Sequence, residues 1–305
     1  MASIGSSKVA PNNNAKRLKA LMENYYEARK EGNKYGYEIR IVEEDNYEHY
    51  YILVKPLAGV YKGHKYIMEL KTTYGRGEDV ATYPTNAPYA HFITDIFHVN
   101  ISSNGGSICL DILKDKSKWS PLNSFDTIVQ NILLLFNEPN NASPYNGDAS
   151  RQWVACEKDY KSYATKHLTV KECDELYMRS FEPFIAQALN VMNRTNFKQF
   201  SKWFPELDPE SVDYVERVAK DEEDFKELEA NILSMKKKKA AERESAKTKS
   251  EVKTNAEVKP NAEVKTNAET TSDAPVNSET KQDVNVDAKP AVDPKKKNRW
   301  AKYQK

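Results

Sequence analysis

Four runs of alternating apolar and polar residues, rich in aromatic side chains, follow one another between residues 37 and 97. They read YEIRIV (37–42), YEHYYILVK (47–55), KYIMELKTT (65–73) and HFITDIF (91–97). A period of two is typical of half-buried strands, and the glycine-containing segment between the second and third runs suits a hairpin. Because such strands pair with their neighbours in sequence, we predict a four-stranded antiparallel meander flanked by helices, in an α+β domain.

Helical patterns lie on both sides of the strand region. Apolar residues spaced i, i+3, i+4 and i+7 from Leu18 predict a helix that begins at Ala15 and stops near the glycine of EGN (31–33). A second helix is predicted within NSFDTIVQNILLLFNEP (123–139), with Asn123 or Ser124 as its cap and a proline at its end.

The chain divides into four predicted parts. Residues 1–14 are a flexible leader, and residues 15–165 are long enough to bury the core of one stable domain. Residues 166–236 form a helical extension. We predict a disordered, basic tail over 237–305, because its six-residue repeat EVKTNAEVKPNAEVKTNAET (251–270) has no aromatic residue and cannot offset its ordering entropy.

Composition limits the possible function classes. No stretch of 18 uncharged apolar residues is present, so we expect no membrane span, and the first residues lack the apolar segment of a secretory signal. The three cysteines are odd in number and lack metal-ligand spacing, which favours free thiols in the cytoplasm, the nucleus or both. We expect no metal and no cofactor. A net charge of +1 gives no global attraction to nucleic acid.

Cys109 lies in an apolar run directly after a turn of Asn, Gly and Ser, in HVNISSNGGSICLDIL (98–113). One interpretation is a small core residue. The other is a nucleophile that is reached rather than buried, because the small turn residues leave room for an acyl group and Asn100 could direct a carboxamide N–H towards an oxyanion. His98 is too close in sequence to be an obvious base. A thiol without a strong base suits exchange onto an activated thioester.

Several blocks resemble, in order, the signatures of ubiquitin-conjugating enzymes. They are GVYKG (59–63), YPTNAPYAHF (83–92), HVNI (98–101), NGGSICLDIL (104–113), WSP (119–121) and NEPNNASPYNGDA (137–149). The resemblance covers about residues 15–165. It implies that Cys109 takes the carboxyl terminus of ubiquitin from an activating enzyme as a thioester, and that a substrate lysine then attacks it, usually with a ligase.

The resemblance also implies roles for four other residues. Asn100 matches an asparagine that stabilises the oxyanion or orders the active-site loop. His98 matches a structural histidine, and we expect Asp111 to brace the loop rather than transfer protons. Ser143 stands where many relatives have an acidic gate residue, so we expect slower lysine transfer without a partner, since serine cannot offset the charge of the incoming lysine.

The chain departs from the pattern at several other positions. The middle proline of the motif is Val99, the segment between Asn100 and Cys109 has an extra glycine that could shift the reach of Asn100, and the loop before Trp119 is about two residues longer. The bulky apolar residue that usually follows YP is Thr85.

The resemblance places ligase contacts in two loops. One contains Thr85, and the other contains Ser120, Pro121 and Leu122. Because an apolar anchor normally dominates such an interface, the threonine predicts an altered choice of ligase.

The basic segments KKKK (236–239) and KKKNRWAKYQK (295–305) leave three alternatives open. They could be a nuclear signal or a weak nucleic-acid contact, with Trp300 and Tyr303 stacking on bases, or simply solvated lysines, some of them self-modified. Cys156 is expected to be inert, as is Cys173.

Three classes of function follow from these patterns. The first is an active ubiquitin-conjugating enzyme. The second is a non-catalytic scaffold of the same fold that binds ubiquitin, or an enzyme for another ubiquitin-like modifier. The third, a nucleic-acid-associated factor, rests only on the basic tail. The presence of Cys109 favours the first class.

Overall fold

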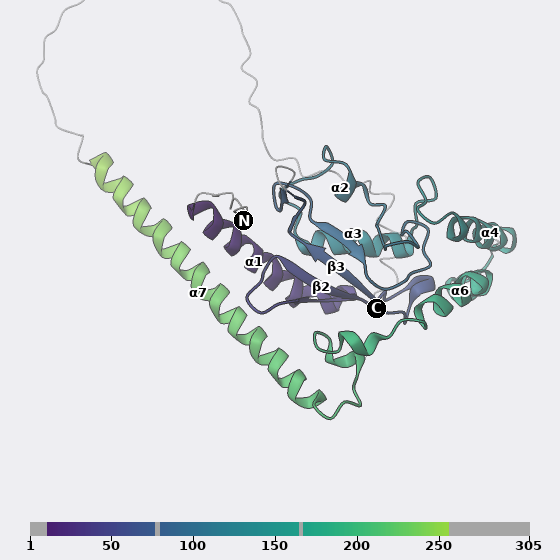
Figure 1. Cartoon of the computed structure of the whole chain (residues 1–305). Helices are drawn as coiled ribbons and strands as arrows, with labels where there is room; N and C mark the ends of the chain where they lie inside the picture. The colour runs from purple at the N-terminus through teal and green to yellow at the C-terminus, as the bar shows by residue number, and fades with distance from the viewer. Residues whose placement is uncertain (1–10, 77–79, 165–166, 256–305) are drawn as a thin grey trace, which may run out of the picture. The chain divides into compact units, whose positions relative to one another are not determined.

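The computed structural model describes residues 11–76, 80–164 and 167–255. Its centre is a four-stranded antiparallel sheet in the order β1-β2-β3-β6 (Figure 1). The strands are β1 (Tyr37–Ile41), β2 (His49–Val54), β3 (Tyr66–Lys71) and β6 (Tyr89–Phe92). The predicted meander is therefore confirmed. A second, two-stranded sheet of β4 (Thr73–Tyr74) and β5 (Ala81–Thr82) was not predicted.

The fourth strand ends almost where the predicted one begins. Beyond Phe92 the chain leaves the ladder, because the backbone N–H groups of Ile93 and Thr94 both donate to the carbonyl of Ile67, at 2.8 and 3.4 Å. The Thr94 hydroxyl in turn accepts from the N–H of Ile67 at 3.0 Å. The apolar pattern by itself predicts that the strand continues to residue 97, but tertiary hydrogen bonds end it at Phe92.

Helix α1 (Pro11–Tyr35) is longer than predicted at both ends. It starts four residues before Ala15, which corrects the leader prediction for 11–14, while residues 1–10 lie outside the described residues. Gly32 does not stop it. A Cβ there would lie 2.6 Å from the carbonyl oxygen of Tyr37, so this glycine permits close approach of β1. The helix ends instead before Gly36, whose φ of 87° favours glycine.

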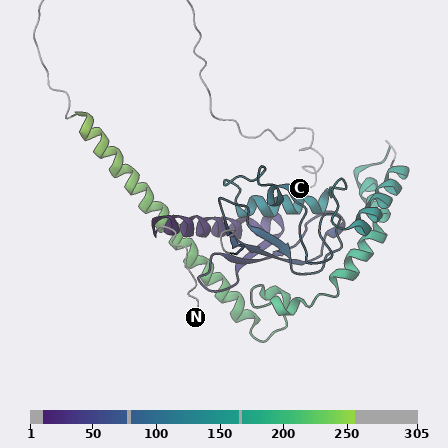
Figure 2. The ribbon, with the colours of Figure 1, turned by 45° about the horizontal axis from the view of Figure 1, so that its top comes forward.

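Helix α3 (Phe125–Asn137) covers the inner face of the sheet together with α1 (Figures 1 and 2). Of the two predicted caps, Asn123 and Ser124, the structure has Ser124, whose hydroxyl accepts from the N–H of Thr127 at 3.1 Å. The rings of Tyr50 and Phe125 lie 5.0 Å apart in an edge-on contact. The short helices η1 (Gly59–Tyr61) and α2 (Asp111–Lys114), and α4 (Gly147–Tyr163), complete this region.

The extension is helical, as predicted, but part of it shares the domain's core. It contains α5 (Val170–Ser180), α6 (Glu182–Met192), η3 (Phe197–Phe200), η4 (Pro205–Leu207) and α7 (Tyr214–Asn255). The ring of Phe181 lies 4.7 Å from that of Trp153 on α4, and Phe184 lies 5.9 Å from Tyr61. All four rings are buried, so α6 packs as part of the domain.

The outer face of the sheet is covered by the segment that contains η3 and η4. Phe200, Phe204 and Leu207 form a small core with two sheet residues, Leu53 and Ile67. The indole N–H of Trp203 donates to the carbonyl of Val42 at 3.0 Å. Burial of apolar side chains on both faces makes the sheet the middle layer of the fold.

Helix α7 crosses the boundary predicted at residue 236 and ends at Asn255. This corrects the predicted disorder for 237–255, whereas 256–305 lie outside the described residues. Asp221 on α7 pairs with Arg29 and Arg40, each at 2.7 Å. Within the described ranges, no helix is both long and apolar enough to cross a membrane.

Candidate active site

The glycine-rich turn before Cys109 is folded against the edge of the sheet. The N–H of Phe92 in β6 donates to the carbonyl of Gly106 at 2.9 Å, and isolated bridges join His91 to Ser107 and Ile101 to Ile108. A Cβ on Gly106 would lie only 1.9 Å from the carbonyl oxygen of Phe92, and its φ is 62°. Glycine is therefore required at this position, because no side chain fits between the turn and β6.

Cys109 is only 7% exposed, so the expectation of a cysteine held out of the core is wrong for the residue as a whole. Its backbone N–H donates to the carbonyl of Asn100 at 2.8 Å. Its sulfur nevertheless has exposed residues as neighbours, since Sγ is 3.4 Å from the hydroxyl of Ser143 and 3.4 Å from Nζ of Lys114. Cys109 is thus anchored by its backbone, and its thiol lies beside two exposed side chains.

The carboxamide of Asn100 is fully occupied by the loop that follows α3. Its Nδ2 donates to the carbonyls of Asn140, at 2.8 Å, and of Ser143, at 3.3 Å, while Oδ1 accepts from the N–H of Asn140 at 2.7 Å. Asn100 is completely buried. These three hydrogen bonds fit the loop-ordering alternative, because they hold the segment that carries Ser143 beside the thiol.

His98 is completely buried, and both ring nitrogens have backbone partners. Nε2 donates to the carbonyl of Leu135 at 3.0 Å, and Nδ1 accepts from the N–H of Asn100 at 2.9 Å. These partners require the neutral ring. Burial lowers the pKa of His98 to about 4, although the hydrogen bond to Leu135 opposes this shift. This geometry fits the expected structural role.

The burial of His98 predicts a pH dependence of stability. Its pKa is about 4 when folded and ordinarily 6.5, so the unfolded chain binds this proton first as the pH falls. The contribution is complete well above pH 6.5, and we expect a loss of about 1.2 kcal/mol of unfolding free energy between pH 6 and 5. Denaturant titrations of wild type and His98→Asn at several pH values measure the slope of unfolding free energy against pH, which should be shallower in the variant. His167→Asn is the matched control, because His167 is exposed and its substitution should leave the slope unchanged; equal slopes for all three proteins would contradict the prediction.

Asp111 points into its own loop. It is the first residue of α2 and pairs with Nζ of Lys118 at 2.5 Å. With 67% of its side chain exposed, this pair contributes little to stability, but it fits the predicted bracing role.

Sequence reasoning did not identify Lys114 or Tyr145. Lys114 is the last residue of α2, and its Nζ lies 4.2 Å from the centroid of the Tyr145 ring as well as 3.4 Å from the sulfur of Cys109. An ammonium group at this distance stabilises negative charge on sulfur. A cation five residues beyond the cysteine was visible in CLDILK, but only the short helix shows that it turns back towards the thiol.

The two predicted ligase-contact loops lie side by side. The indole N–H of Trp119 donates to the carbonyl of Pro84 at 2.9 Å, which joins the loop of Thr85 to the loop of Ser120 and Pro121. Thr85 is exposed, and Leu122 is 92% exposed. Leu122 is therefore the accessible apolar side chain of this paired surface.

The remaining cysteines do not join the site. Cys156 is buried in α4, and burial raises the pKa of its thiol. Cys173 is half-buried in α5. Among the described residues, no group of three or more His, Cys, Asp and Glu side chains is placed to hold a metal ion.

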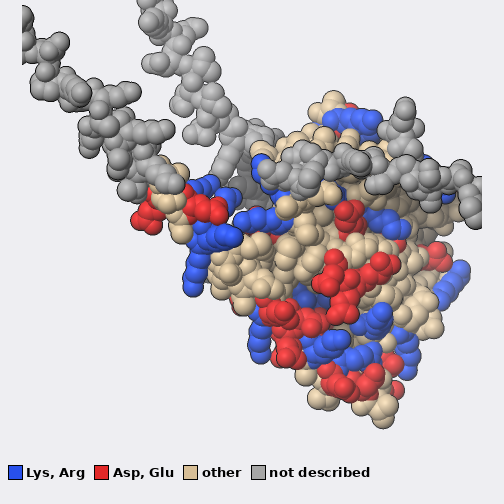
Figure 3. Space-filling view, turned by 60° about the vertical axis from the view of Figure 1, so that its left-hand side comes forward, with Lys and Arg blue, Asp and Glu red and all other residues tan. Residues whose placement is uncertain are grey.

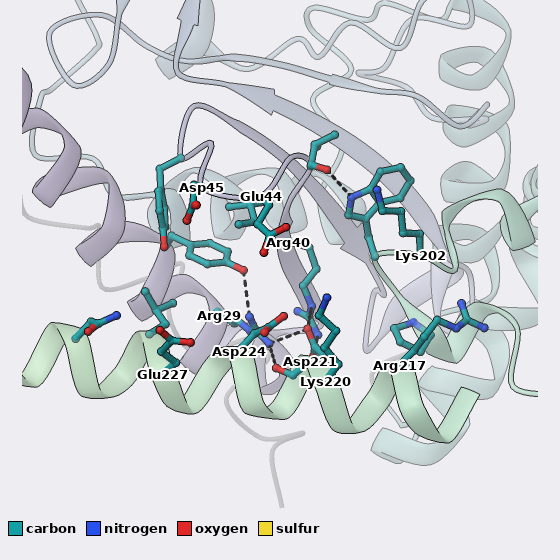
Figure 4. Close-up of a pocket in the computed structure, with 18 residues that line it drawn as sticks. Arg29, Arg40, Glu44, Asp45, Lys202, Arg217, Lys220, Asp221, Asp224 and Glu227 are labelled. Carbon is teal, nitrogen blue, oxygen red and sulfur yellow. Dashed lines mark hydrogen bonds and ion pairs between the residues drawn. The ribbon is translucent and has the colours of Figure 1, made fainter. Parts of the chain in front are cut away.

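A cavity of about 480 Å³ lies away from these residues, between α1, the loop after β1 and α7. Acidic and basic side chains line it together, and Asp221 already pairs with Arg29 and Arg40 (Figure 4). A space-filling view likewise shows acidic groups among the Lys and Arg side chains (Figure 3). Within the KKKK segment, Lys236 pairs with Glu27 at 3.1 Å, while the basic segment 295–305 lies outside the described residues.

Comparisons with known proteins converge on one family. A family model described as "Ubiquitin-conjugating enzyme" matches residues 20–168. "Ubiquitin-conjugating enzyme E2-20 kDa" of Schizosaccharomyces pombe is 40% identical over 96 residues, which are 32% of this chain and 52% of that protein. "Ubiquitin-conjugating enzyme E2 2" of Saccharomyces cerevisiae is 41% identical over 93 residues, 30% of this chain and 49% of that protein. The chain spans about half the length of the curated relatives it matches.

One similar solved structure is titled "Crystal structure of a putative ubiquitin conjugating enzyme from Plasmodium yoelii". It is 24% identical, with a TM-score of 0.41, and the match covers 59% of this chain and 94% of that one.

Proposed function

Because the chain belongs to the ubiquitin-conjugating enzyme family through residues 20–168, we propose that it is an active member, which carries ubiquitin as a thioester on Cys109. Family membership implies ubiquitin, an activating enzyme and a ligase as partners. The observation that carries the proposal is the position of the Cys109 thiol, which lies beside the exposed residues Ser143 and Lys114 on a backbone that is hydrogen-bonded to Asn100.

The proposed chemistry is two successive acyl transfers. The sulfur of Cys109 attacks the thioester carbonyl of ubiquitin on the activating enzyme, a C–S bond forms, and the activating enzyme's thiolate leaves. A neutral lysine amine of a substrate then attacks the new thioester, forming an amide as the sulfur of Cys109 leaves. Asn100 holds the loop beside the thiol, so it acts as a positioning residue in both steps.

Charging with purified components tests this proposal. The wild-type protein is incubated with an activating enzyme, ubiquitin and ATP, and we expect an adduct of one ubiquitin that a thiol reductant removes. Omission of ATP should prevent it. Absence of the adduct with ubiquitin and with other ubiquitin-like modifiers would support the non-catalytic scaffold instead, whereas an adduct only with another modifier would redirect the proposal to that modifier.

The paired surface of Thr85, Ser120, Pro121 and Leu122 is the proposed ligase contact. Its accessible apolar side chain is Leu122, in the second loop. We further propose action in the cytoplasm or the nucleus, on protein substrates with exposed lysines. Nucleic-acid contact by the basic segment 295–305 remains a weaker proposal that rests on composition alone.

Ser143→Asp is expected to accelerate transfer to free lysine. The hydroxyl of Ser143 is 3.4 Å from the sulfur of Cys109, so a carboxylate there would lie close to an incoming ammonium and attract it. We expect a gain of about tenfold, the size of a modest acid–base contribution. Discharge of pre-formed thioester in excess lysine measures it, with Ser143→Asn as the uncharged control. Equal rates for the two variants would contradict the proposed role of charge.

A further inference from the structure

Helix α6 of the extension contacts the segment that leads to Asn100. The ring of Phe184 on α6 lies 5.1 Å from that of Phe97 and 5.9 Å from that of Tyr61. These two ring partners are themselves joined, since the hydroxyl of Tyr61 donates to the carbonyl of Phe97 at 3.0 Å. Phe184 is completely buried, and a close-packed interior passes the loss of even a small volume on to its neighbours.

Both ring partners lie next to His98. The ring of Tyr61 is 5.3 Å from the imidazole of His98, and Phe97 is the residue directly before it in the chain. Nδ1 of His98 in turn accepts from the N–H of Asn100 at 2.9 Å. Direct contacts therefore run from α6 to the backbone of Asn100, whose carboxamide holds the loop beside the active-site thiol.

Two further contacts fix α6 against the domain. The helix lies beside α4 (Figure 1), where the ring of Trp153 is 5.1 Å from that of Phe184. At the end of α6, Sδ of Met192 accepts from the backbone N–H of Lys65 at 3.3 Å, in the segment between η1 and β3. These contacts tie the helix to two separate elements, so the ring of Phe184 is held beside its partners.

We propose that Phe184 is a positioning residue, which acts on Asn100 through its two ring partners and His98. This inference rests on the proposed function, and it gives a part in that function to a helix beyond the residues that match the family. Without the ring, the neighbouring side chains relax into the space it leaves, and the backbone before Asn100 moves with them. A displacement of about 1 Å at a reacting centre costs on the order of 100-fold in rate, so a partial shift has a measurable effect.

Phe184→Leu is expected to slow transfer of ubiquitin from the pre-formed thioester to free lysine about tenfold. The matched control is Phe204→Leu, because Phe204 is also completely buried and also belongs to the extension, but packs on the outer face of the sheet. Both variants should unfold at a lower denaturant concentration than wild type, since each loses buried volume. Rates are measured on the full chain, per thioester and well below both unfolding transitions, and Phe204→Leu should keep the wild-type rate.

Nuclear magnetic resonance gives a readout that a loss of stability alone does not move. The Nδ2 protons of Asn100 are hydrogen-bonded to two backbone carbonyls, so their chemical shifts report the position of the carboxamide. We expect these shifts to change in Phe184→Leu and to match wild type in Phe204→Leu.

Phe97→Leu tests the same route from the other side of the contact. Phe97 is only half-buried, so this variant should fold even if Phe184→Leu does not, and it should also slow transfer. If the two rings act through one contact, the double variant should lose less than the product of the two single losses.

The outcomes separate this inference from the function on which it rests. Slower transfer and changed Asn100 shifts in Phe184→Leu, but not in Phe204→Leu, support it. Equal rates in these two variants, or unchanged shifts in Phe184→Leu, overturn it and leave the proposed function intact. Wild-type transfer in Phe97→Leu, or a double variant that loses the full product, does the same. Absence of any thioester on the wild-type protein overturns both.

Discussion

Replacing Cys109 by alanine is expected to abolish the reductant-sensitive ubiquitin adduct, with a loss of at least about 10³-fold in charging. Alanine cannot form the thioester, and the other two thiols belong to other elements, since Cys156 lies in α4 and Cys173 in α5. The substitution removes only the sulfur atom, and the backbone hydrogen bond from residue 109 to the carbonyl of Asn100 remains, so the variant should still fold. Gel electrophoresis with and without reductant measures the adduct, and thermal unfolding checks the fold.

Cys173→Ala is the matched control for this experiment. Cys173 is the more accessible of the other two cysteines, and it lies in α5, whereas Ser143 and Lys114 contact the sulfur of Cys109. We expect wild-type charging from Cys173→Ala. A reductant-sensitive adduct that survives Cys109→Ala and disappears in Cys173→Ala would assign the nucleophile to α5 and refute the proposed site.

Asn100→Ala is expected to have the second largest effect. The substitution leaves the N–H of Asn140 and the carbonyls of Asn140 and Ser143 without their side-chain partner. We expect a loss of about 2 kcal/mol of unfolding free energy, since desolvated polar groups without partners cost on this order. Because the released loop carries Ser143, charging and lysine transfer should fall together. Denaturant titration and the two rate assays measure these effects.

Asn100→Asp separates the two roles considered for this residue. The aspartate oxygen at Oδ1 can still accept from Asn140, but its second oxygen would face the carbonyls of Asn140 and Ser143, where an N–H donor now lies. A bracing role therefore predicts that stability falls in this variant too. If instead stability and charging are retained and only lysine transfer is lost, Asn100 acts on the oxyanion and the bracing interpretation is wrong.

The sheet was predictable because each of its first three strands alternates sharply enough to define a buried face. The fourth was misplaced by several residues, because the apolar residues after Phe92 belong to the core without belonging to the ladder. Helix ends were also missed. The local pattern predicts that Gly32 ends the helix, but this glycine instead permits the close approach of Tyr37. A helix pattern contains no information about such a contact between elements.

The extension shows the same limit on a larger scale. Its helices were predicted from spacing, but their partners were not. Phe184 packs against Tyr61 in η1, more than 100 residues earlier in the sequence, and Phe204 contributes to the core on the sheet's outer face. Local periodicity predicts that one face of a helix is apolar, but it does not predict which surface covers that face.

The sequence by itself determined the order of the strands, the cap of α3 to within two residues and the choice of Cys109 as the candidate nucleophile, because each depends on neighbours along the chain. Only the tertiary structure decided that the carboxamide of Asn100 braces a loop 40 residues away and that Lys114 lies beside the sulfur. These contacts depend on how loops meet at the end of the sheet. Hydrogen bonds and charges act over a few ångströms, so spatial separation rather than distance in sequence governs which groups share a site.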